Sequence, residues 1–119
     1  MTRYASGRRK EWATVKLLRA RGWLAQRSAG SRGLWDVTAA KRGQRARLIQ
    51  CKYTTALVPA GTHPAAGVVD KNARALLELQ GDDETPVDAE LWVYHRGTAA
   101  PVVYYPWQGS WRRMMLRRA

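Results

Sequence analysis

The positions of apolar residues along the chain predict two helices. In the first, expected over residues 8–21, Val15 and Leu18 lie on one face and Gly22 follows as a stop signal. The second is expected over residues 69–80, where apolar residues again recur at helical spacing. Each helix therefore has one apolar face, which we expect to pack against the rest of the fold.

Five shorter runs have the composition and alternation that are typical of strands. They are expected over residues 23–28, 34–39, 48–53, 89–94 and 102–107. The resulting order of helix, three strands, helix and two strands predicts an α+β or α/β sheet that helices cover. Residues 54–67 contain two prolines and no sustained periodicity, so we expect a long loop there.

Two of these runs, joined by a turn at residues 41–44, carry three polar residues that strand geometry places together. Alternate side chains of a strand point to opposite faces. If the apolar residues of the two runs line the core, Asp36, Gln50 and Lys52 share the other face of the hairpin. Oxygen ligands beside a lysine can hold a hard divalent cation and activate a water molecule.

A fourth polar residue, Glu11, lies on the apolar face of the first helix, one turn before Val15. An acid in this position is costly to bury without a partner, so it needs a cation, an arginine or an opening to solvent. A surface pair with Lys10 or Arg8 is the simpler alternative. The apolar face on which Glu11 stands argues against that alternative.

The charge of the chain narrows the class of partner. Its 119 residues, typical of one domain over 1–119, carry a formal charge of +12. Such an excess suits a polyanion, and nucleic acid is the commonest one. No run of 18 apolar residues and no apolar secretion signal is present, so we expect no membrane contact and a cytoplasmic location. The single Cys51 excludes an intrachain disulfide, and with two distant histidines it excludes a Cys/His zinc site.

The four polar residues belong to a wider pattern that resembles the archaeal-type Holliday junction resolvases, which also occur in phages. These are members of the PD-(D/E)xK nuclease superfamily. The segments that carry the resemblance are 7–11, 17–18, 22–23, 27–31, 35–37 and 50–52. The resemblance implies an α/β, restriction-endonuclease-like core with a central mixed five-stranded sheet flanked by helices.

The resemblance also implies roles for individual residues. Four groups would bind Mg²⁺, or Mn²⁺ in its place: the side chains of Glu11, Asp36 and Gln50 and the backbone carbonyl of Cys51. Lys52 would polarise the attacking water, and Ser31 or Ser28 in the glycine- and serine-containing loop would contribute to cleavage. Basic residues cluster in sequence around this site, and the net charge of +12 favours phosphate contacts over the alternative of a solvated basic face; the residues expected to contact DNA are Arg8, Arg9, Lys10, Arg27, Ser28 and Arg32.

The chain departs from the pattern of the superfamily at two positions. Trp35 replaces the proline of the PD dipeptide, and Gln50 replaces the glutamate of the ExK motif. A glutamine offers a neutral carbonyl oxygen but no charge, which should weaken Mg²⁺ binding. The Gln-x-Lys form also occurs in Mrr-like members of the superfamily, so the change is compatible with an active enzyme.

The function implied is a Mg²⁺-dependent, structure-selective DNA endonuclease that resolves four-way (Holliday) junctions by paired symmetric nicks. Two nicks require two sites, which implies a homodimer. One alternative is an Mrr-like or other repair or restriction endonuclease of the same fold. The other is a basic nucleic-acid-binding protein without catalysis. Residues 108–119 are expected to form a basic tail, and the location would be the host cytoplasm if a phage encodes the protein.

Overall fold

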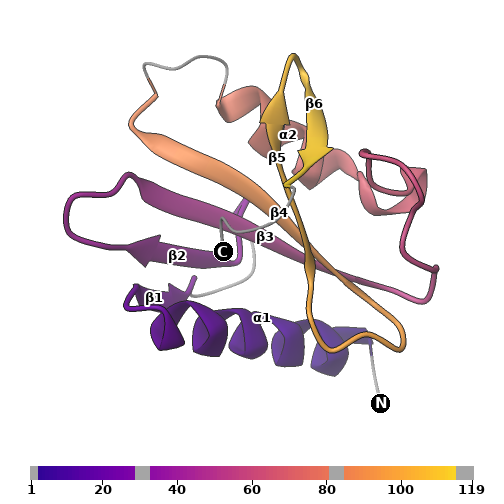
Figure 1. Cartoon of the computed structure of the whole chain (residues 1–119), viewed down its shortest axis with the longest axis horizontal. Helices are drawn as coiled ribbons and strands as arrows, with labels where there is room; N and C mark the ends of the chain where they lie inside the picture. The colour runs from indigo at the N-terminus through magenta and orange to yellow at the C-terminus, as the bar shows by residue number, and fades with distance from the viewer. Residues whose placement is uncertain (1–2, 29–32, 81–84, 115–119) are drawn as a thin grey trace.

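A mixed six-stranded sheet lies between two helices in the computed structural model, which describes residues 3–28, 33–80 and 85–114 (Figure 1). The elements are α1 (Arg3–Ala20), β1 (Leu24–Arg27), β2 (Val37–Ala40), β3 (Ala46–Thr54), η1 (Ala66–Val68), α2 (Lys71–Leu79), β4 (Val87–His95), β5 (Val102–Trp107) and β6 (Ser110–Arg113). The α/β class, both helices and the first five strands are thus confirmed, with boundaries shifted by a few residues.

The strands lie in the sheet in the order in which they occur in the chain. Among the strands that the structure describes, only β3 and β4 pair in parallel, and the other neighbouring pairs are antiparallel. The connection from β3 to β4 carries η1 and α2 across one face of the sheet, as parallel pairing requires. Of the polar residues predicted on β3, Gln50 lies at the middle of the strand and Lys52 lies near the end from which the chain leaves toward α2.

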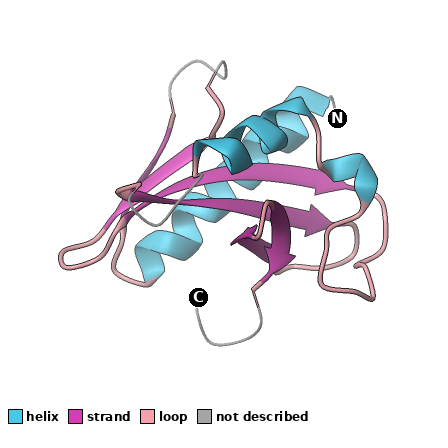
Figure 2. Cartoon of the chain, turned by 90° about the horizontal axis from the view of Figure 1, so that it is seen from above, coloured by secondary structure: helices cyan, strands magenta, loops and turns pink. Residues whose placement is uncertain are grey.

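Each face of the sheet has its own core, and the strands lie between the two helices (Figure 2). On the α1 side, Val15 and Leu18 pack against Ile49 and Trp92. On the opposite face, the core residues include Leu48, Ala73, Leu76, Leu91, Tyr104 and Trp111. The central strands are therefore buried on both faces, which is usual for a parallel pair. None of the helices in the described ranges is long and apolar enough to cross a membrane.

The prediction of five strands is wrong, because residues 110–113, within the stretch expected as a basic tail, form β6; residues 115–119 of that stretch lie outside the described residues. A tight turn with positive φ at Gln108 (50°) and Gly109 (78°) reverses the chain from β5 into β6. Trp111 then anchors β6: it is buried, and its indole N–H donates to the Ala73 carbonyl at 3.2 Å. One apolar residue among arginines is too weak a pattern to indicate a strand.

Candidate functional site

Asp36 lies immediately before β2 and is fixed by hydrogen bonds to two neighbouring strands. Its backbone N–H donates to the Ile49 carbonyl at 2.8 Å, and its carbonyl accepts the Ser28 N–H at 2.8 Å. Its side-chain Oδ2 accepts the Cys51 N–H at 2.9 Å. The carboxylate is therefore held at the junction of β2 and β3, as the hairpin in the sequence predicted.

The environment of Asp36 shifts its protonation. Burial raises the pKa of the Asp36 carboxyl above 3.8, and the hydrogen bond from the Cys51 N–H opposes this rise. The negative charges of Glu11 and Asp70 raise the pKa further, whereas the ammonium group of Lys52 lowers it. All four charged groups thus lie close enough to interact. A half-buried carboxyl with a perturbed pKa among charged neighbours is a feature of functional sites.

Gln50 is only 3% exposed, and its side-chain carbonyl oxygen Oε1 has no hydrogen-bond partner within the described part of the chain. A buried polar atom without a partner is costly and calls for a ligand or a water molecule. Val37 of β2 is paired with Ile49 of β3. Because the two strands are antiparallel, the adjoining residues Asp36 and Gln50 are also opposite one another. The two side chains therefore lie on the same face of the hairpin.

Lys52, two residues along β3, forms an ion pair with Oδ2 of Asp70. Asp70 caps the N-terminus of α2, where its Oδ1 accepts the Ala73 N–H at 3.0 Å. Sequence reasoning missed Asp70, because it placed the start of the second helix at Val69. An aspartate just before a helical segment is the expected N-cap pattern, and that signal could have identified it.

Glu11 pairs with an arginine, which is one of the three alternatives that its position on the apolar face of α1 allows. Its Oε1 accepts a hydrogen bond from Arg27 Nε of β1 at 3.0 Å, and the guanidinium of Arg27 lies 5.4 Å from the ring centroid of Trp12. Among the residues that the structure describes, no three His, Cys, Asp or Glu side chains are grouped so that they could hold a metal ion. Of the expected metal ligands, Glu11 is thus occupied by Arg27, whereas Gln50 Oε1 has no partner within the described residues.

The thiol of Cys51 points away from this cluster, toward α1. Its Sγ lies 3.2 Å from Thr14 Oγ1, which in turn is 2.7 Å from the Tyr94 hydroxyl. Burial raises the pKa of the Cys51 thiol, and it also raises the pKa of Tyr94 to about 12. Both groups stay protonated at neutral pH, so Cys51 is not a nucleophile here and only its backbone faces Asp36.

The expected DNA-contacting residues occupy different positions. Arg8 and Arg9 are exposed on α1, and the ammonium group of Lys10 lies 5.5 Å from the ring centroid of Tyr53. Arg27 binds Glu11, and the backbone of Ser28 binds Asp36, as described above. Ser31 and Arg32 lie outside the described residues.

The sequence has no match among the family models, and no curated protein is similar enough to count as a relative. Among solved structures, the chain is similar to Hjc, a Holliday junction resolvase from the archaeal hyperthermophile Archaeoglobus fulgidus. The two structures superpose with a TM-score of 0.58 over 92% of this chain and 83% of that chain, at 16% sequence identity. At this identity, the similarity shows that this chain has a resolvase-like fold.

Proposed function

We propose that this protein is a divalent-metal-dependent, structure-selective DNA endonuclease of the PD-(D/E)xK type, which resolves four-way junctions by paired nicks. The observation that carries the proposal is the fixed carboxylate of Asp36, with its raised pKa, on the hairpin face that also carries the unpartnered oxygen of Gln50 and Lys52, whose ammonium acts on that pKa. The resolvase-like fold and the net charge of +12 support a DNA substrate.

The oxygen atoms at this site fit a hard divalent cation. Asp36 and the Oε1 atom of Gln50 would hold Mg²⁺ or Mn²⁺, together with the carbonyl of Cys51. Glu11 would join them directly or through a water molecule, and its present partner Arg27 would then be released toward the DNA backbone. When bound, the ion would stabilise negative charge on the scissile phosphate and on the leaving 3′ oxygen.

Side chains of the protein would orient the attacking water molecule and bind the DNA backbone. The ammonium group of Lys52 would donate hydrogen bonds that orient the attacking water molecule, and its charge would stabilise the hydroxide that forms when that water releases a proton to the surrounding solvent. Attack at phosphorus breaks the bond to the 3′ oxygen and leaves a 5′ phosphate. Arg8, Arg9 and Lys10 would bind the flanking phosphates without reading the base sequence.

Resolution of a four-way junction requires two symmetric nicks, so the active species would be a homodimer with one site in each subunit. Binding to junction and to linear DNA should both weaken steeply with salt, because Lys and Arg contacts release counterions. The preference for the junction should change less, because it depends on the spacing of the two sites.

The experiment that tests this function is cleavage of a synthetic four-way junction with each strand labelled in turn. We expect nicks at symmetric positions on opposing strands with Mg²⁺ or Mn²⁺, and none in EDTA. A preparation that binds the junction but never cuts it with any divalent ion would contradict the enzyme and leave a basic DNA-binding protein. A monomer that cuts linear duplex equally well would favour the Mrr-like alternative.

A further inference from the structure

The two carboxylate oxygens of Asp70 have different partners. One oxygen, Oδ1, accepts the Ala73 N–H at 3.0 Å and caps α2, and the other, Oδ2, binds the ammonium group of Lys52. The cap fixes the position of the carboxylate, because the helix backbone holds Oδ1. The side chain of Lys52 is consequently held by a group that is itself anchored to α2.

Asp70 is ionised when it makes these contacts. Partial burial, which by itself raises the pKa, is outweighed by the hydrogen bonds from Lys52 and from the Ala73 backbone, so the pKa of Asp70 lies below 3.8. Asp70 and Lys52 both act on the carboxyl of Asp36, which places the pair beside the proposed reaction centre. The charge of Asp70 is therefore available at any pH at which the nuclease would work.

The Lys52–Asp70 pair is poorly suited to a stabilising role. The side chain of Lys52 is 23% exposed and that of Asp70 is 46% exposed. Ion pairs that are this accessible contribute little to folding, because solvent screens them and both side chains lose freedom. A long lysine side chain that is held in one place does, however, present its ammonium group in a defined direction.

We propose that Asp70 is a positioning residue, which holds the ammonium group of Lys52 beside Asp36 for the orientation of the attacking water; this inference rests on the proposed function. The connection from β3 to α2 thus contributes to the site, although no motif in it indicates this. Lys52 acts on the reaction, and Asp70 acts only through Lys52.

The substitution Asp70→Asn separates the two tasks of this carboxylate. Its remaining side-chain oxygen can still accept the Ala73 N–H, so the helix cap is kept. The amide that replaces Oδ2 is a donor and faces the donor group of Lys52, so the ion pair is lost. Asp70→Glu is the rescue variant, because it keeps the charge.

Asp88→Asn is the matched control for the loss of one surface carboxylate. The side chain of Asp88 is 47% exposed and pairs with Arg45 at 2.9 Å, at the other end of the parallel pair of strands. It resembles Asp70 in exposure and in having a basic partner. It differs in having no contact with Lys52.

The first measurement is junction cleavage under single-turnover conditions, with junction affinity measured in parallel. For Asp70→Asn we expect the maximal rate to fall about ten- to a hundredfold, with unchanged junction affinity and melting temperature. Asp70→Glu should recover part of the rate, and Asp88→Asn should match the wild type. A wild-type rate in Asp70→Asn, or a loss confined to affinity, would overturn the positioning role.

The second measurement needs no cleavage. In protein labelled with ¹⁵N-lysine, the ammonium group of Lys52, assigned by its loss in Lys52→Ala, should give a protected NMR signal in the wild type and in Asp88→Asn. The signal should disappear in Asp70→Asn, and its persistence there would overturn the inference. An inactive wild type with the signal intact would refute the nuclease, whereas an active wild type without it would refute only the role of Asp70.

Discussion

Strand β3 carries two ion pairs, five residues apart, that differ in almost every physical respect. Near its start, Arg47 binds Glu90 of β4 through two hydrogen bonds of 2.6 Å, and the two side chains are 7% and 5% exposed. Near its end, Lys52 binds Asp70 of α2, and both side chains remain accessible to water. The first pair is therefore in a position to stabilise the fold, whereas the second is accessible to a substrate.

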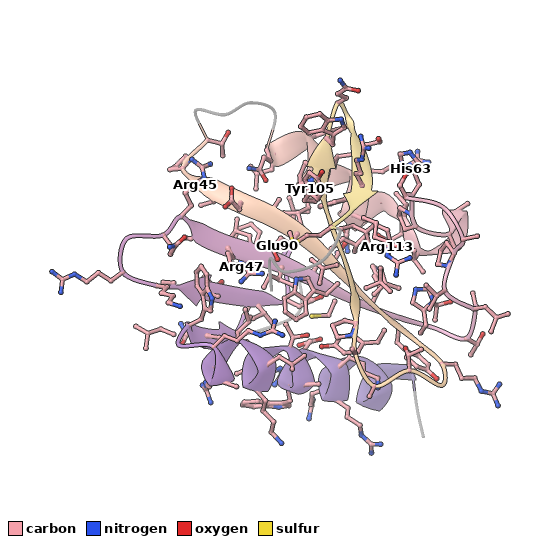
Figure 3. The ribbon with its side chains drawn as sticks, viewed as in Figure 1. Arg45, Arg47, His63, Glu90, Tyr105 and Arg113 are labelled. Carbon is pink, nitrogen blue, oxygen red and sulfur yellow. The ribbon has the colours of Figure 1, made fainter. Side chains whose placement is uncertain are left out.

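Arg47 and Glu90 lie in the middle of the sheet (Figure 3), and further partners complete their contacts. Glu90 Oε1 also accepts the indole N–H of Trp92 at 2.8 Å. The guanidinium of Arg47 lies 4.8 Å from the ring centroid of Trp23 and 5.8 Å from that of Trp92. Both charges are therefore satisfied within the protein, which is the condition under which a buried pair is tolerated.

From Gln50 onward, β3 and the adjoining Asp36 include polar groups that are incompletely satisfied. Gln50 Oε1 has no partner within the described residues, and burial holds the pKa of Asp36 above its usual value. Oxygen acceptors in this state gain the most from a bound cation. The same strand thus supplies a closed ion-pair network near its start and, from Gln50 to Lys52, an unpartnered oxygen and a partly accessible ammonium group.

The largest expected effect is a loss of junction cleavage when Lys52 is replaced. Lys52→Ala should reduce the rate of junction cleavage by about 10²- to 10⁴-fold, the usual loss when a group that assists proton transfer is removed. Its melting temperature should stay near that of the wild type, because the pair with Asp70 is exposed. Single-turnover cleavage and thermal unfolding measure the two effects, and near-normal cleavage would mean that Lys52 has no catalytic role.

At the closed end, Arg47→Ala should affect stability instead. Removal of one partner leaves Glu90 buried and unpaired, so the free energy of unfolding should fall by about 3–5 kcal/mol. Arg45→Ala is the control, because Arg45 also forms an ion pair with a residue of β4, Asp88, but both side chains are exposed. Exposed pairs contribute about 0–1 kcal/mol to the free energy of unfolding. Denaturant unfolding compares the two variants; equal losses would remove the distinction between the two ends of β3.

Stability should also depend on pH through Asp36. Its pKa is raised in the folded protein, so the protonated carboxyl favours folding and ionisation costs stability as the pH rises through the folded-state pKa. Asp36→Asn removes that cost and can still accept the Cys51 N–H. The variant should melt above the wild type at neutral pH and lose this advantage below pH 3.8. An advantage that is independent of pH would exclude the charge of Asp36 as its cause.

The smallest expected effect concerns the metal requirement. Gln50→Glu adds an anionic ligand at a position that now offers a neutral oxygen, so less Mg²⁺ should be needed for the half-maximal rate. A titration of cleavage rate against Mg²⁺ concentration measures this. An unchanged or higher requirement would show that Gln50 does not face the ion.

Sequence reasoning succeeded where the relevant contacts are local or follow from strand alternation. The alternation around Asp36 and Gln50 correctly placed them together at the hairpin, because adjacent antiparallel strands have a defined register. The position of Glu11 on an apolar helix face correctly indicated the need for a partner, which is Arg27. Periodicity could show that a partner was required, but it could not identify it.

It failed where the fold joins segments without a local pattern. Asp70 reaches Lys52 only because the crossover returns α2 over the sheet, and nothing in the loop of residues 54–67 encodes that path. Leu48 also shows that the face of Gln50 and Lys52 is covered by a second core, which alternation alone could not reveal. The strand around Trp111 was missed because packing against α2, rather than composition, determines it.

The most direct test of a nuclease centre at Asp36 compares the wild type with Asp36→Asn on one labelled four-way junction, with binding and cutting measured in the same samples. Both proteins should bind the junction with similar affinity. Only the wild type should produce paired nicks with Mg²⁺, and EDTA should abolish them. Cutting by Asp36→Asn at the wild-type rate would contradict a centre at this residue.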